Sequence, residues 1–149
     1  MEQCELVPGR GIRRNRDNTD IFFGMPRMKL REALDYEKPT GDTMWDDEDE
    51  YSNGDGDEWL RLRFLDEKLC DIEVLGGHLA HEGIELLATD MPTLRAALKQ
   101  GGMALEKTEW LSEGHDCIDL QIVVASREDA GDVGEEIAWV ITSSDFRVE

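Results

Sequence analysis

The sequence predicts an α+β fold: an antiparallel sheet built from two β-α-β-β repeats, with the helices covering one of its faces. The first observation is a recurrence, because the segment LREAL at residues 30–34 returns as LRAAL at residues 94–98. The second is that alternating apolar segments, typical of half-buried strands, follow both copies in the same order. We therefore expect a single domain over residues 1–149, with repeat one at about 20–76 and repeat two at about 83–143.

Each repeat is expected to start with a short apolar strand and a helix. In repeat one the strand covers residues 20–24, and Pro26 suits the first turn of the helix, where its missing N–H costs nothing. In repeat two the strand covers residues 83–87, Asp90 caps the helix and Gly101 ends it. Both helices have narrow apolar stripes, so we expect them on the buried face of the sheet.

Each helix is followed by a predicted hairpin. In repeat one the hairpin strands are residues 59–65 and 72–75, and in repeat two they are residues 118–124 and 138–141. Along these segments apolar residues alternate with polar or charged ones, the pattern of a sheet with one buried and one wet face.

The charge is strongly acidic. The chain has 35 Asp and Glu residues against 16 Lys and Arg, giving a formal net charge of -19 and a pI of about 4.4. This charge argues against direct binding to a nucleic-acid backbone, whose affinity comes from cationic side chains. No apolar run long enough for a membrane span occurs, the start lacks the pattern of a secretory signal, and three cysteines do not form a disulfide framework. These features predict a cytoplasmic protein with no membrane partner.

Two acidic segments concentrate the charge. Residues 39–57 hold eight carboxylates and no basic residue, and residues 127–136 form a second acidic loop before the last strand. Trp45 either pins the first segment to the body of the protein or acts as an aromatic anchor for a basic partner. The candidate partner-binding residues are Trp45, Asp46, Asp47, Glu48, Asp49, Glu50, Tyr51, Asp55, Asp57, Glu58, Glu128, Asp129 and Asp132.

No motif for catalysis or metal binding stands out. The first acidic segment does not fit an EF-hand loop, because Tyr51 falls on a ligand position. His78 and His81 have a spacing that would place both imidazoles on one helical turn, but a zinc site needs three or four converging ligands. We predict no cofactor, no metal and no catalytic residue. A metal-dependent enzyme using His78, His81 and carboxylates is kept as an alternative.

A basic cluster near the start, Arg10, Arg13, Arg14 and Arg16, is expected to pair with the acidic loops of the same molecule.

Two segments carry a family resemblance: LVPGRGI at residues 6–12, and FFGMPxxxLxxxL at residues 22–34. The second repeat keeps this spacing in Ala88, Leu94 and Leu98. The pattern resembles the bacterial beta-lactamase-inhibitor-like and SmpA/OmlA group, in which a G-M-x-x-x-x-[LV]-x-x-x-L helix start precedes antiparallel strands. The resemblance implies duplicated helix-plus-hairpin repeats and a protein-binding scaffold without catalytic residues. It assigns no individual functional residue.

The acidic character is also similar to that of bacterial toxin immunity proteins. An acidic surface speeds association with a basic partner and competes for its cationic groove. The function expected from the sequence is therefore that of a non-enzymatic immunity or inhibitor protein that neutralises a basic toxin or nuclease. A further alternative is a DNA mimic, in which carboxylates stand in for the phosphates of a duplex.

Overall fold

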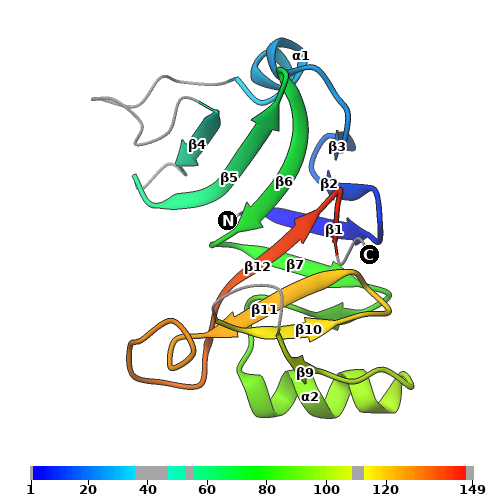
Figure 1. Ribbon diagram of the computed structural model, residues 1–149, viewed down its shortest axis with the longest axis vertical. Coiled ribbons are helices and arrows are strands. Elements are labelled where there is room, and N and C mark those ends of the chain that lie inside the picture. The colour runs from blue at the N-terminus through cyan, green and yellow to red at the C-terminus, as the bar shows by residue number, and fades with distance from the viewer. Residues whose placement is uncertain (1, 36–46, 53–55, 109–112, 147–149) are drawn as a thin grey trace.

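The computed structural model describes residues 2–35, 47–52, 56–108 and 113–146, and most of its regular structure is β-strand. Sheet A has five strands in the order β3 (Thr19–Phe22), β2 (Gly11–Arg14), β1 (Gln3–Val7), β7 (His78–His81), β8 (Ile84–Glu85). Sheet B has seven strands in the order β4 (Glu48–Ser52), β5 (Glu58–Leu65), β6 (Lys68–Val74), β12 (Ile137–Ser143), β11 (Ile122–Ser126), β10 (His115–Cys117), β9 (Glu106–Lys107). Helices α1 (Arg27–Ala33) and α2 (Met91–Gln100) lie at opposite ends of the long axis (Figure 1).

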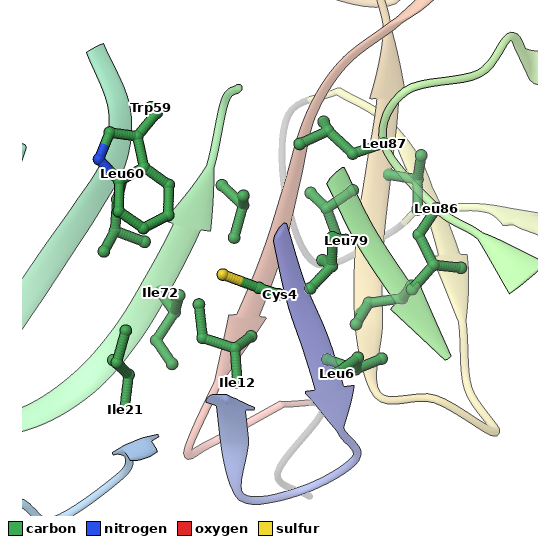
Figure 2. Close-up of a cluster of buried hydrophobic side chains, with 14 of the residues drawn as sticks. Cys4, Leu6, Ile12, Ile21, Trp59, Leu60, Ile72, Leu79, Leu86 and Leu87 are labelled. Carbon is green, nitrogen blue, oxygen red and sulfur yellow. The ribbon is translucent and has the colours of Figure 1, made fainter. Parts of the chain in front are cut away.

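The core is formed by side chains from both sheets. Cys4 and Leu6 of β1 and Ile12 of β2 belong to the same buried cluster as Leu60 of β5 and Ile72 of β6 (Figure 2). Full burial of each such aliphatic side chain stabilises the fold by about 1.5–3 kcal/mol. The inner face of sheet B is therefore covered mainly by a second sheet.

The predicted α+β architecture, with two β-α-β-β repeats and helices covering one face, is therefore wrong. Residues 3–14 supply β1 and β2, which the sequence prediction missed, and these strands cover sheet B where the helices were expected. The helices are too short for that role, and α1 buries only Arg27 and Leu30. The helix-plus-hairpin architecture implied by the family resemblance is likewise not observed.

Several local predictions are confirmed. The strands predicted at 59–65 and 72–75 pair as the antiparallel β5 and β6. Helix α2 begins after Asp90, whose side chain accepts a hydrogen bond from the backbone N–H of Thr93 at 2.9 Å. The strand predicted over 118–124 is wrong in its first half, because residues 118–121 form the turn between β10 and β11.

The two halves of sheet A are joined by a parallel pair. Strand β1 pairs with β7 in the register Gln3 to His78 and Glu5 to Ala80. Gly77, which precedes β7, has a positive φ of 79°, and a Cβ there would collide with the carbonyl oxygen of Glu2. This glycine allows the chain to enter the strand beside β1.

Candidate functional site

Most of the described part of the first acidic segment is a strand. Residues Glu48–Ser52 form β4, the edge strand of sheet B, with Glu48 opposite Arg63 and Glu50 opposite Arg61 of β5. The expectation of a loop over 39–57 is therefore wrong for these residues. Because side chains alternate along a strand, Asp49 and Tyr51 face inward, where both are buried, while Glu48 and Glu50 face outward.

Asp49 is the best-buried carboxylate among the described residues of the segment, with an exposed fraction of 0%. Arg27 donates to it from Nε at 3.1 Å and Nη2 at 2.7 Å, and Arg31 donates from Nε at 2.8 Å and Nη2 at 2.7 Å. Arg27 also lies 5.0 Å over the ring of Phe64. We call Asp49, Arg27 and Arg31 the Asp49 cluster. It joins α1 to the edge strand.

The pKa of Asp49 follows from these contacts. Burial alone raises the pKa, but the hydrogen bonds from Arg31 and Arg27 outweigh burial and hold it below its usual value. Asp49 is thus an ionised structural residue. It was predicted to contact a partner, as was Tyr51, but both side chains are enclosed by the fold.

A second charged group lies on the outer face of β5. The guanidinium of Arg61 lies 2.8 Å from a carboxylate oxygen of Glu58, 3.2 Å from one of Glu73 and 3.7 Å from one of Glu50. We call these four residues the Arg61 cluster. The single guanidinium group of Arg61 forms ion pairs with three carboxylates, so the cluster has a net negative charge when all four groups are ionised.

The Arg61 cluster borders a groove of about 430 Å³ on the outer face of sheet B. We call it the charged groove; it is lined by Glu48, Arg61, Arg63, Asp71, Glu73, Ile141, Ser143 and Asp145. Arg63 forms an ion pair with Asp71. With Glu50 and Glu58 of the Arg61 cluster included, six carboxylates face two guanidinium groups, a formal charge of -4 when all are ionised.

Two carboxyl groups of the groove have raised pKa values. Burial raises the pKa of Glu73, and repulsion from Glu58 and Glu48 adds to the effect although Arg61 opposes it. Burial also raises the pKa of Glu48, again against the attraction of Arg61. Both groups are therefore ionised less readily than a free Glu, and a cation placed beside them would be attracted.

The second acidic segment lies elsewhere. Residues 127–136 connect β11 to β12 near α2, at the opposite end of the long axis from β4 (Figure 1). Asp129 accepts hydrogen bonds from the backbone N–H of Ser126 and lies 3.1 Å from Nδ1 of His115, while Glu128 and Asp132 are exposed. The two acidic segments therefore do not form one surface, as the sequence prediction had assumed.

The other predicted residues divide by position. Asp47 and Asp57 are exposed and Glu58 is half-buried at the groove. Trp45, Asp46 and Asp55 lie outside the described residues.

The basic cluster near the start pairs locally. Arg13 binds Asp20 at 2.6 Å and Arg14 binds Asp17 at 2.6 Å, because the hairpin of β2 and β3 brings these side chains together. The expected pairing with the acidic loops is therefore wrong for these two residues. Arg16 lies 3.5 Å from a carboxylate oxygen of Glu2, and Arg10 lies over the ring of Phe22.

The histidines do not converge. His78 and His81 belong to β7, a strand, so their spacing places them on opposite faces instead of one helical turn. Nδ1 of His78 lies 2.7 Å from Glu85, and Nδ1 of His81 lies 3.3 Å from the carbonyl oxygen of Leu6. Within the ranges that the structure describes, no group of three or more His, Cys, Asp or Glu side chains is arranged to hold a metal.

The cysteines have the environment of structural thiols. Burial raises the pKa of Cys4 to about 12, and it also raises the pKa values of Cys70 and Cys117. A nucleophilic cysteine requires the opposite shift, which stabilises its thiolate.

Sequence reasoning missed most of the groove. Glu48 was a candidate partner-binding residue, but the other charged residues of the groove were not: Arg61, Arg63, Asp71, Glu73 and Asp145. Asp71 and Glu73 are two positions apart on β6, so they share a face, and they lie opposite Arg63 and Arg61 of β5. Alternating acidic residues on one strand and alternating basic residues on the next are the sequence pattern that could have identified this pairing.

In the described part of the chain, neither helix is long and apolar enough to cross a membrane. No family model matches the sequence, and no curated protein or solved structure shows significant similarity to the chain.

Proposed function

We propose that the protein is a non-enzymatic binding module of the immunity or inhibitor type, which neutralises a basic protein partner through the charged groove. The observation that carries the proposal is the surplus of carboxylates on this face, where six anionic groups surround Arg61 and Arg63. Because sheet geometry fixes these groups, they form a pre-organised surface for cationic side chains.

The charge pattern favours a protein over a nucleic acid as the partner. The net charge of -19 repels phosphates, and the two arginines of the groove are already bound by carboxylates. The same arginines interrupt the row of anions, so the face does not copy the uniform charge of a duplex. These features favour the inhibitor over the DNA mimic.

An inhibitor of this kind first attracts its partner electrostatically and then blocks the partner's surface. The negative potential of the groove attracts the partner over a distance of about one Debye length, and contact then covers the partner's cationic surface. The proposal includes the cytoplasmic location expected from the sequence, where the three free thiols would persist.

The test is an association measurement with the product of the adjacent reading frame. We expect the rate constant to fall about tenfold or more between low and high salt, as for steered complexes. The double variant Glu50→Gln/Glu58→Gln should slow association, and the matched variant Glu128→Gln/Asp132→Asn, with the same charge change at the other end of the molecule, should leave the rate nearly unchanged. A rate that ignores salt, or a larger effect of the distant pair, would overturn the proposal.

A further inference from the structure

We infer that the edge of β4 accepts one further strand, an extended segment of the basic partner that pairs antiparallel to β4 and carries Lys or Arg at two alternate positions. The inference rests on the proposed function, and it specifies how the partner docks. Strand β4 ends sheet B on one side (Figure 1). Its residue Glu48 lines the charged groove, so a strand added at this edge would border that groove.

The first step is to find which backbone groups of β4 point away from sheet B. The N–H of Phe64 in β5 donates to the carbonyl oxygen of Asp47 at 2.8 Å. Hydrogen-bonded residues alternate along an antiparallel pair, so Asp49 also bonds to β5, and the N–H and C=O groups of Glu48 and Glu50 point the other way. In the described part of the chain, no strand pairs with β4 on that side. A row of unpaired backbone groups at a sheet edge is a template for an added strand.

The second step is the direction of the added strand. Nη2 of Arg27 donates to the carbonyl oxygen of Glu48 at 3.3 Å, so this acceptor is already used. A parallel strand opposite Asp49 would need that carbonyl together with the N–H of Glu50. An antiparallel strand opposite Glu50 uses instead both backbone groups of Glu50 and the N–H of Glu48. Within the described ranges these groups have no backbone partner, so the edge favours antiparallel addition.

The third step is the choice of side chains on the outer face. Glu48 and Glu50 lie on the outer face of β4, two positions apart. Residues directly opposite each other in an antiparallel pair share a face, with Cβ atoms about 4.5–5.5 Å apart, and opposite charges at such positions stabilise the pair. The added strand therefore carries Lys or Arg at i, opposite Glu50, and at i+2, opposite Glu48. A second copy of β4 is disfavoured as the added strand, because its own carboxylates would face these two residues.

The fourth step concerns the residue between the two cations. Position i+1 lies opposite Asp49 on the inner face, where the guanidinium groups of Arg27 and Arg31 donate to the Asp49 carboxylate. A cation at i+1 would be placed beside two positive charges and would gain no free carboxylate. The selected segment is therefore cationic, neutral and cationic at successive positions, which differs from a uniformly basic run.

The experiment uses the capped peptide Val-Lys-Thr-Lys-Val and two derivatives of the same charge as probes. In one derivative the backbone nitrogen of the first Lys is methylated, which removes the N–H that donates to Glu50. In the other the Thr nitrogen is methylated, and its N–H points away from β4 in the added strand. Each peptide is titrated into the full chain at low salt, and the dissociation constant is measured from NMR shifts. Methylation of Lys should weaken binding about tenfold or more, and methylation of Thr should change it little.

Measurements on the protein locate the added strand. Binding of the unmethylated peptide should slow hydrogen exchange at the backbone N–H of Glu50. The double variant Glu48→Gln/Glu50→Gln should weaken binding, and the matched variant Glu128→Gln/Asp132→Asn, with an equal charge change in the distant loop, should preserve it. Circular dichroism confirms that both variants are folded.

Four results would overturn the inference: equal binding of the two methylated peptides, a loss caused by methylation of Thr instead of Lys, absence of binding, or a dimer of the free chain that already protects the N–H of Glu50. If the association with the basic protein still depends on salt and on Glu50 and Glu58 in any of these cases, the proposed function stands and only strand addition fails.

Discussion

The Asp49 cluster and the Arg61 cluster use the same kinds of side chain on opposite faces of β4 and β5, yet their stoichiometries are reversed. One buried carboxylate lies between two guanidinium groups, and one half-buried guanidinium lies among three carboxylates. In the first, the buried carboxylate is enclosed by hydrogen bonds from both guanidinium groups, and the result is a fixed contact between helix and strand. In the second, the excess charge faces solvent. Stoichiometry and burial, not composition, separate a structural ion group from a binding surface.

The largest expected effect comes from breaking the buried cluster. Asp49→Ala removes the carboxylate to which both Arg27 and Arg31 donate, and it leaves Arg27, which is 8% exposed, without its closest anion. Removing one partner of a buried ion pair costs about 3–5 kcal/mol of unfolding free energy. Urea denaturation measures this loss, and Asp132→Ala at an exposed site is the control. A loss below about 1 kcal/mol would show that the cluster does not hold β4.

A smaller effect is expected from breaking the outer cluster. Arg61→Gln leaves Glu50, Glu58 and Glu73 facing one another, but Arg61 is 34% exposed and solvent screens the repulsion. We expect a loss of about 1 kcal/mol at low salt. High salt should recover most of that loss, because exposed charges are screened, and it should not recover the loss in Asp49→Ala. Equal salt sensitivity of the two variants would contradict the distinction between the clusters.

The smallest effect is a difference in pH dependence. The pKa of Asp49 is lowered by folding, so its stabilisation is present above the usual value of 3.8 and is lost as the pH falls through the folded-state pKa. The pKa of Glu73 is raised from 4.5, so the native state binds its proton more readily and loses stability as the pH rises through that range. The unfolding free energy of Asp49→Asn should therefore fall less than that of the wild type as the pH is lowered through this range.

Glu73→Gln should change the same profile in the opposite sense. Its unfolding free energy, relative to that of the wild type, should improve as the pH rises from 4 towards 7. Thermal melts of both variants across this range provide the measurement. If the unfolding free energies of the two variants changed with pH in the same way, the opposite pKa shifts of Asp49 and Glu73 would be refuted.

Part of this arrangement was predictable from the sequence. The alternation in β5 and β6 is strong because bulky apolar residues occupy every second position, and the capping of α2 by Asp90 depends only on neighbours in the chain. Strands β1 and β2 were missed because each is short, with few apolar positions on its inner face. The Pro8 and Gly9 pair between them is a turn signal that marks the hairpin.

The role of Asp49 was not predictable from the acidic run that contains it. Five consecutive acidic residues at 46–50 offer no local signal that one of them is to be buried. Asp49 is the residue that is buried because Arg27 and Arg31 donate hydrogen bonds to it. The two arginines are four residues apart on α1 and so share one helix face. Only the tertiary packing of α1 against β4 brings the two segments together.

The parallel pairing of β1 with β7 has a consequence for how the chain folds. Gln3 pairs with His78, so β1 stays without this partner until the chain between them, which includes α1 and β2 to β6, has been synthesised. Contacts of such long sequence separation carry a large loop-closure cost and slow the folding of β proteins to about milliseconds to seconds. In the interval, the apolar positions of β1 are exposed to other nascent chains. The acidic charge of the growing chain, which repels its own copies, would limit association during this period.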